Sequence, residues 1–126
     1  MSAQHITSGP DIPKSHLPFS AAVRAGDFIF VSGQASTDMN GKVISGDFEA
    51  EFRRSIGHLI AILKAAGATL KDVVQVKSYV KDAADLQLYN KLYREYFTEP
   101  FPARTTITNC LGHVKYEIDV IAYVGK

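Results

Sequence analysis

Arg104 is the residue whose type and position first point to chemistry. It begins the β-branched segment Thr105–Thr108, directly after the rigid Pro102-Ala103 step. An arginine at the mouth of a strand can present a planar fork of N–H donors to a carboxylate or a phosphate. The alternative is a structural ion pair with an acidic residue, and the spacing alone does not decide between the two. We therefore treat Arg104 as a candidate anchor for an anionic ligand.

Glu117 is the second candidate, and it lies in the last predicted strand, on the face that is not expected to meet the helices. In a partly dry cleft, burial disfavours the charged form of a carboxyl group, so the group can exchange protons near neutral pH. Glu117 could instead be a solvated strand residue or the ion-pair partner of Lys115 or Lys77. Asp119 has the same parity and the same two interpretations.

Two further segments could line a ligand site. Ser32-Gly33-Gln34 follows the apolar segment Phe28–Val31 and offers backbone N–H groups where a side chain is absent. Such groups can hold an anion or a carbonyl oxygen, although a serine and a glycine at a strand end also form ordinary turns. Asn90 lies beside the apolar stripe of a predicted helix, where its amide either lines a cleft or is partly exposed.

The sequence carries no known cofactor or metal motif. No GxSxG, Walker or Rossmann pattern occurs, and the four histidines show no ligand spacing. The one cysteine, Cys110, allows no intrachain disulfide. We therefore expect no metal, no cofactor and a reducing compartment.

Composition predicts one folded domain over residues 1–126. The chain is 46% hydrophobic and 21% charged, which excludes the class of disordered proteins. Its net charge of +1 gives no global attraction to nucleic acid or to an anionic membrane, so we expect neither as a partner. The amino-terminal segment lacks the features of signal and transit peptides, and Leu59–Leu63 is too short to cross a bilayer. We expect a cytoplasmic protein.

A first helix is predicted from Phe48, where apolar side chains begin to recur every three or four residues. Acidic residues from Asp47 onward favour its amino-terminal end, and Gly67 is placed to stop it. Its apolar stripe comprises Phe48, Phe52, Ile56, Leu59, Ile60 and Leu63.

A second helix is predicted after Asp82, which can cap it with Asp85 as a partial capping box. Pro100 and Pro102 end it. Its apolar face comprises Leu86, Tyr89, Tyr93, Tyr96 and Phe97.

Strands are predicted before, between and after these helices. Ala21–Ser32 predicts a hairpin with a glycine in its turn, and the Asn40-Gly41 turn leads into Lys42–Ile44. The remaining predicted strands are Val73–Val80, Arg104–Cys110 and Val114–Val124. The resulting class is α+β, with one mostly antiparallel sheet and two helices on one face.

The last predicted strand alternates with a period of two, so one face packs against the helices. The other face mixes charged residues with large apolar ones such as Ile121 and Tyr123. Tyr79 and Ile107 are expected on that face too. Two helices cannot cover both sides of the sheet, and another copy of the chain is the simplest cover.

The Pro-Ala-Arg step at 102–104, followed by Glu-Ile-Asp-x-Ile-Ala at 117–122, is the most specific pattern in the chain. Together with the other motifs it closely resembles the YjgF/RidA (L-PSP) family of reactive-intermediate deaminases over nearly the whole length. The other matching segments are Pro18–Ala22, Phe30–Gln34, Leu63–Gly67, Asp72–Val74, Asn90, Tyr93, Tyr96-Phe97 and Phe101–Thr106.

The resemblance implies a chorismate-mutase-like fold and a homotrimer with active sites in the clefts between subunits. Arg104 would bind the substrate carboxylate, and Glu117 would position or activate water. Gly33 would contribute backbone, while Ser32 and Asn90 would lie in or beside the cleft. The implied reaction is hydrolysis of an enamine or 2-imino acid to a 2-oxo acid and ammonia, without a metal or organic cofactor.

Three departures from the family pattern concern the cleft wall. Phe19 stands where deaminase members commonly have tyrosine, and Thr106 stands where many have cysteine. The link Leu111–His113 is shorter than usual and lacks the typical proline. A larger enamine acid, such as 2-aminomuconate, is therefore an alternative substrate. An alternative function is that of a non-catalytic trimer, which either binds 2-oxo acids or acts like a chaperone. The near-balanced charge argues against a ribonuclease.

Overall fold

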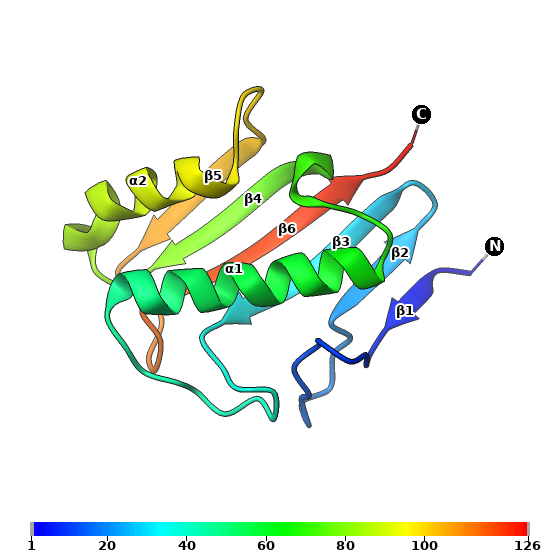
Figure 1. The fold of residues 1–126 in the computed structure, drawn as a ribbon, viewed down its shortest axis with the longest axis horizontal. Helices are drawn as coiled ribbons and strands as arrows, with labels where there is room; N and C mark the ends of the chain where they lie inside the picture. Colours follow the sequence, from blue (N-terminus) through cyan, green and yellow to red (C-terminus); the bar gives the residue numbers. More distant parts are fainter. Residues whose placement is uncertain (1, 126) are drawn as a thin grey trace.

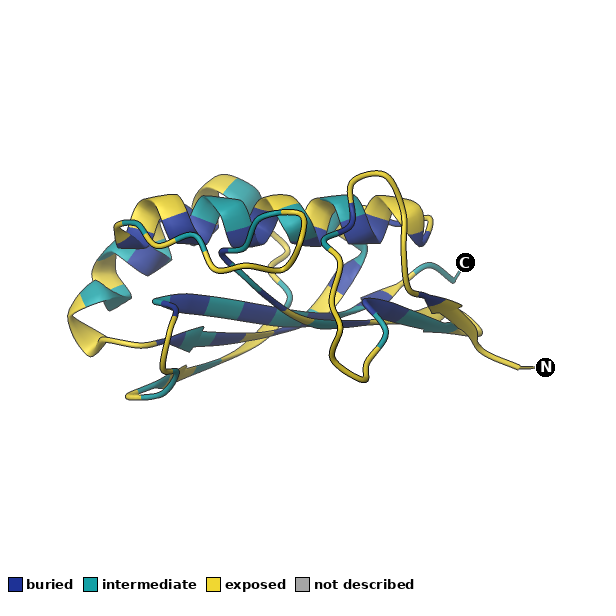
Figure 2. Cartoon of the chain, turned by 90° about the horizontal axis from the view of Figure 1, so that it is seen from below, coloured by how far each residue is buried: buried dark blue, intermediate teal, exposed yellow. Residues whose placement is uncertain are grey.

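One sheet carries two helices on a single face, as Figures 1 and 2 show. The computed structural model describes residues 2–125. The helices are α1 (Phe48–Ala65) and α2 (Leu86–Tyr96), with 3-10 turns η1 (Leu70–Asp72) and η2 (Ala83–Asp85) before β4 and α2. The strands are β1 (Gln4–Ile6), β2 (Ala22–Ala25), β3 (Phe28–Ala35), β4 (Val73–Val80), β5 (Ala103–Thr108) and β6 (Tyr116–Tyr123).

The six strands run in the order β1-β2-β3-β6-β4-β5. All neighbours are antiparallel except β4 and β5, which are parallel because α2 carries the chain back between them. The sheet is therefore mixed and mostly antiparallel, and the predicted α+β class is confirmed. The short edge strand β1 is an element that the sequence pattern did not predict.

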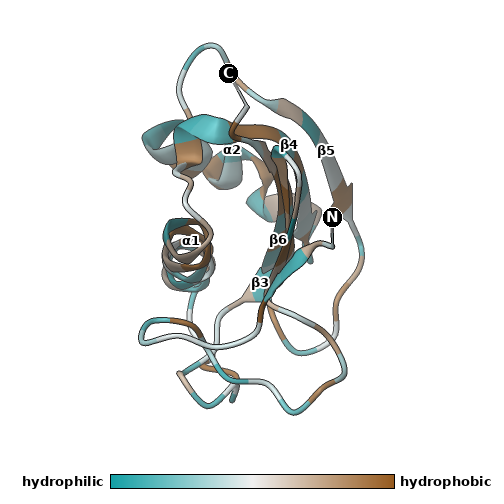
Figure 3. Cartoon of the chain, turned by 90° about the vertical axis from the view of Figure 1, so that its right-hand side faces the viewer, coloured by the Kyte–Doolittle hydropathy of each residue, from teal (hydrophilic) through white to brown (hydrophobic). Residues whose placement is uncertain are grey.

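The core lies between the sheet and α1, which Figure 3 shows edge-on. Alternate residues of β6, from Tyr116 to Ala122, are buried under the helices. The predicted stripe of α1 packs onto them, with one exception. Ile60 is 42% exposed because it lies at the margin of the stripe. Asp47 accepts a hydrogen bond from the Ala50 amide, and Gly67 follows the helix with φ +88°, as expected of the two ends.

Three local predictions were wrong. Asp82 caps the 3-10 turn η2 rather than α2, and Asp85 makes no capping hydrogen bond through its side chain. Lys42–Ile44 forms only an isolated bridge between Thr37 and Val43.

The ends of the last two strands also differ from the prediction. β5 ends at Thr108, before Cys110, because Asn109 has a left-handed φ of 58°. β6 begins at Tyr116 instead of Val114 and ends at Tyr123.

The side of the sheet away from the helices, which we call the open face, carries exposed apolar side chains. Phe30 is 45% exposed, Ile107 42% and Tyr123 38%. Tyr79 and Ile121 are half-buried on the same face. The predicted apolar patch is confirmed. Among residues 2–125, no helix is long and apolar enough to cross a bilayer.

Candidate functional site

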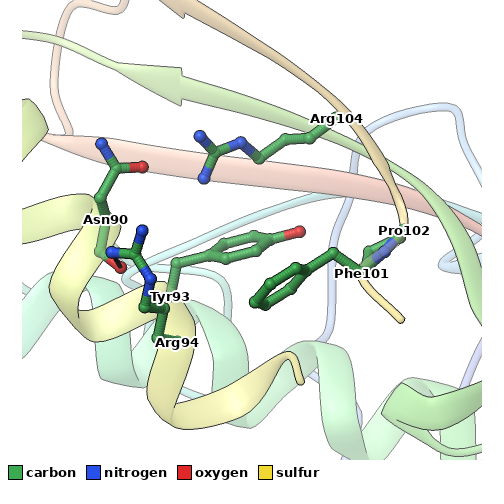
Figure 4. Close-up of a pocket in the computed structure, with 6 residues that line it drawn as sticks. All are labelled: Asn90, Tyr93, Arg94, Phe101, Pro102 and Arg104. Atoms are coloured by element: carbon green, nitrogen blue, oxygen red, sulfur yellow. Dashed lines mark hydrogen bonds between the residues drawn. The ribbon is translucent and has the colours of Figure 1, made fainter. Parts of the chain in front are cut away.

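A pocket of about 220 Å³ lies between α2 and the start of β5 (Figure 4). It is lined by Asn90, Tyr93, Arg94, Phe101, Pro102 and Arg104. The register of the sheet explains why Arg104 reaches it. Arg104 pairs with Val76, whose side chain is fully buried on the helix side of the sheet. The Arg104 side chain therefore lies on the helix side, in front of α2.

Aromatic rings hold the Arg104 guanidinium in place. Its Cζ lies 5.0 Å from the ring centroid of Tyr89 and 4.7 Å from that of Tyr93, distances at which cation–π attraction operates. No ion pair within residues 2–125 involves Arg104. The structural ion pair, which was the alternative from the sequence, is not present in this part of the chain. The guanidinium is exposed and its N–H donors remain available to an anion.

Thr106 lies on the same side of β5 as Arg104. Its hydroxyl is 3.2 Å from the hydroxyl of Tyr89, so the two side chains share a hydrogen bond. Asn90, one residue after Tyr89 on α2, is half-buried and lines the pocket. The structure thus brings three predicted residues, Asn90, Arg104 and Thr106, to one place.

Glu117 lies in a second hollow, on the open face. This hollow is lined by Leu17, Phe19, Val31, Ser32, Gly33, Glu117 and Asp119. Glu117 pairs with Tyr79 of β4 and with Ala35 of β3, so it points away from the helices. Burial raises the pKa of Glu117 above its ordinary value of 4.5, and the neighbouring Asp119 carboxylate raises it further. Glu117 is therefore suited to give and take protons.

Gly33 and Ser32 form the β3 wall of this hollow. The β3–β6 register shifts between Val31 and Gln34, which places Gly33 at an irregularity of the strand. A side chain at Gly33 would collide with the Glu117 carboxylate. The Ser32 hydroxyl donates to the Ser20 carbonyl (2.6 Å), and the Ser32 amide donates to the Ala21 carbonyl (3.0 Å). Ser32 therefore fixes the chain beside the hollow.

Phe19 is 50% exposed at the rim of the hollow. It contributes an aromatic ring and no hydroxyl to the hollow that Glu117 also lines. The predicted residues thus fall into two groups on opposite sides of the sheet. Asn90, Arg104 and Thr106 form one, and Phe19, Ser32, Gly33 and Glu117 form the other. Within one chain, these two groups of residues do not form a common site.

Four of the six pocket residues were not predicted as site residues, namely Tyr93, Arg94, Phe101 and Pro102. The sequence pattern assigns Tyr93 only to the apolar face of α2. Arg94 follows Asn90 by one helical turn, and this spacing is the signal that could have placed both on one face.

Known proteins share this sequence pattern and fold. The profile of the family described as Endoribonuclease L-PSP matches residues 10–124. A RutC family protein of Pyrococcus abyssi is 41% identical over 124 residues, 96% of this chain and 98% of that protein. A Dermatophagoides farinae protein named 2-iminobutanoate/2-iminopropanoate deaminase is 32% identical over 108 residues, 85% of this chain and 84% of that protein.

A solved structure of a related protein has the same fold. The crystal structure of RidA from the Antarctic bacterium Psychrobacter sp. matches with a TM-score of 0.86 and 30% identity, over 96% of this chain and 99% of that one. Fold and sequence together define a protein of the L-PSP class. The chain belongs to the YjgF/RidA family.

Proposed function

We propose that the protein hydrolyses 2-imino acids to 2-oxo acids and ammonia, at sites that two copies of the chain build together. The observation that carries the proposal is the placement of Arg104 and Glu117 on opposite sides of one sheet. An anion anchor and a proton-exchanging carboxyl group can act on one small molecule only if they come from different chains. The relative named 2-iminobutanoate/2-iminopropanoate deaminase supports the same chemistry.

The assembly follows from the two surfaces involved. The α2–β5 edge of one copy would meet the open face of the next, covering exposed side chains such as Phe30 and Ile107. A contact between two different surfaces is head-to-tail, and such contacts form a ring when the rotation from one copy to the next closes. We infer a homotrimer, the ring that the family resemblance implies, and a cytoplasmic location.

In the proposed reaction Arg104 binds the substrate carboxylate through its paired N–H donors. Glu117 of the neighbouring copy takes a proton from water as the water oxygen bonds to the C=N carbon, and it passes that proton to the imine nitrogen, so that a neutral carbinolamine forms. The resulting carbinolamine collapses when its hydroxyl forms the C=O bond and the C–N bond breaks. Glu117 takes the hydroxyl proton of the carbinolamine and gives it to the departing nitrogen, so ammonia and a 2-oxo acid leave and the carboxylate is regenerated.

The raised pKa of Glu117 supports this double role, because a carboxyl group that holds its proton more tightly is a better base once it is ionised. The second hollow also supplies the reacting centre with a partly dry environment. No step requires a metal or an organic cofactor.

A second candidate function is a non-catalytic trimer that binds 2-oxo acids. It is favoured by Phe19, which brings no hydroxyl to the hollow that contains Glu117. In this alternative Arg104 binds the carboxylate and no bond changes.

Turnover separates the two candidates. An amino-acid oxidase generates 2-iminobutanoate or 2-iminopropanoate in situ, and release of the 2-oxo acid is followed with and without the purified protein. We expect clear acceleration by the wild type and a loss of roughly 100-fold or more in Glu117→Gln, the range that general acid–base catalysis contributes. The matched control is Glu99→Gln, an exposed glutamate outside both hollows. Binding of 2-oxobutanoate without any acceleration would instead support the second candidate.

A further inference from the structure

The α2–β5 pocket contains two arginines and no acidic residue. Arg94 lies on α2 one turn after Asn90 and lines the same pocket as Arg104. Figure 4 shows both guanidinium groups on the Asn90 side of the pocket. None of the six residues that line it carries a carboxylate. The pocket is therefore a site of concentrated positive charge.

This charge is not neutralised within residues 2–125. None of the ion pairs there involves Arg94 or Arg104. Glu95, the acidic residue next to Arg94, pairs with Arg53 instead, at 3.0 Å. Arg94 donates only a long hydrogen bond of 3.4 Å to the Asn90 carbonyl. Two free guanidinium groups on one small cavity favour a ligand with two negative charges.

The other residues that line the pocket indicate which further groups such a ligand would contain. Phe101 and Pro102 give the pocket an apolar side that suits a short carbon chain. Tyr93 is only 4% exposed, and its hydroxyl has no hydrogen-bond partner in the described chain. A buried hydroxyl without a partner is rare in folded proteins, and a ligand atom or an ordered water would satisfy it. Desolvation raises the pKa of Tyr93 to about 12, so this hydroxyl stays a donor at neutral pH.

We propose that the substrate is a dicarboxylic 2-imino acid. Arg104 binds the carboxylate next to the C=N bond, and Arg94 binds the second carboxylate at the far end of the carbon chain. Arg94 is thus the residue that determines specificity between one-carboxylate and two-carboxylate substrates. The inference rests on the proposed deaminase function, and it adds the substrate class.

Paired substrates test the role of Arg94. Oxidation of amino acids in situ supplies 2-iminoglutarate, with two carboxylates, and 2-iminobutanoate, with one. We expect the wild type to prefer 2-iminoglutarate. In Arg94→Gln the ratio of the two kcat/KM values should fall about tenfold, which corresponds to about 1.4 kcal/mol. Lys91→Gln removes the same charge from the exposed side of α2 without lining the pocket, so it should leave the ratio as in the wild type.

Calorimetric binding of the products separates this inference from the proposed function. We expect 2-oxoglutarate to bind Arg94→Gln about tenfold more weakly than it binds the wild type, with a smaller effect on 2-oxobutanoate. If no imino acid is turned over but this binding difference appears, the deaminase proposal is wrong and the assignment of Arg94 stands.

Two results would overturn the inference. In the first, 2-iminobutanoate is turned over but the substrate ratio does not respond to Arg94→Gln, so Arg94 does not contact substrate. In the second, Arg94→Gln weakens the oligomer, measured by mass photometry, without changing selectivity. Arg94 would then pair with a carboxylate of a neighbouring copy.

Discussion

Gly33 and Glu117 face each other so closely that any side chain at position 33 would displace the Glu117 carboxylate. A Cβ built on Gly33 lies 3.0 Å from the Glu117 carboxyl carbon and collides with one carboxylate oxygen. The glycine at the β3 irregularity therefore sets where the carboxylate sits above the open face. A larger residue would move the carboxylate and leave the rest of the fold in place.

Gly33→Ala tests this relationship. We expect turnover of 2-iminobutanoate to fall about 100-fold, because a displacement of roughly 1 Å costs that much when a reacting group must be aligned. Gly57→Ala is the matched control, since a Cβ at Gly57, in α1, meets nothing within 4 Å. That control should be active and more stable by about 0.4–1 kcal/mol in a denaturant melt. Full activity in Gly33→Ala would show that Glu117 does not act at this position.

We expect the pH dependence of activity to report the ionisation of Glu117, the proposed base. Its pKa is raised above 4.5 by burial first and by Asp119 second, so the carboxylate needed as a base forms only above that value. The acidic limb of kcat/KM should therefore have its midpoint above pH 4.5. Asp119→Asn should lower the pKa of Glu117 and move the midpoint to lower pH. An unmoved midpoint in that variant would assign the limb to another group.

The raised pKa of Glu117 also makes the free energy of unfolding depend on pH. A carboxyl group whose pKa is higher in the folded state than in the unfolded state binds its proton more tightly when folded. Its contribution to the free energy of unfolding is thus present below about pH 4.5 and declines as the pH rises through the folded pKa. Glu117→Gln should be at least as stable as the wild type at pH 7, and thermal melts across pH check this.

Mixing two inactive variants tests whether the site is shared between copies. Arg104→Ala retains Glu117, and Glu117→Gln retains Arg104. In random head-to-tail trimers of the two, three in four assemblies are mixed and each contains one intact site in three, so about one quarter of wild-type activity should return. Co-expression with two different tags supplies the mixed assemblies. No recovery in purified mixed trimers would mean that Arg104 and Glu117 do not meet across an interface.

Glu51 offers a test of what positions β6. It is 1% exposed, and its carboxylate accepts hydrogen bonds from the Lys115 amide (2.9 Å) and the Gly46 amide (3.1 Å). The ammonium of Lys115 lies 3.3 Å away. Glu51→Ala leaves two amides without partners, so we expect a loss of about 2–4 kcal/mol in a denaturant melt. Glu49→Ala, which removes an exposed i,i+4 pair with Arg53, should cost under about 1 kcal/mol.

Periodicity predicted the elements well where one face of each is buried. The alternation of β6 and the stripe of α1 predicted the sheet, the helices and the open face, because burial on one side imposes a strict period. Asp82 shows the limit: a capping residue fits both a 3-10 turn and an α-helix, and only the packing of Leu86 onward sets where α2 begins.

The candidate site was harder to predict from the sequence than the fold. Residue type and family resemblance identified Arg104 and Glu117 as candidates. Their placement on opposite sides of the sheet follows from strand register, in which Arg104 pairs with Val76 and Glu117 pairs with Tyr79. Strand register is a long-range property, and no local pattern contains it. The spacing of four residues places Arg94 on the same face of α2 as Asn90, but only the return of β5 to α2 makes the pocket that both residues line.

The two tyrosine rings that pack against Arg104 also provide an intrinsic spectroscopic probe of ligand binding. The chain has six tyrosines and no tryptophan, so energy transfer to an indole does not quench the tyrosine fluorescence. Two of those tyrosines, Tyr89 and Tyr93, lie within 5.0 Å of the Arg104 guanidinium. An anion that docks on Arg104 changes the field at both rings. We therefore expect ligand binding to change the intrinsic tyrosine fluorescence of the unlabelled wild-type protein, and a titration of this change would measure ligand affinity.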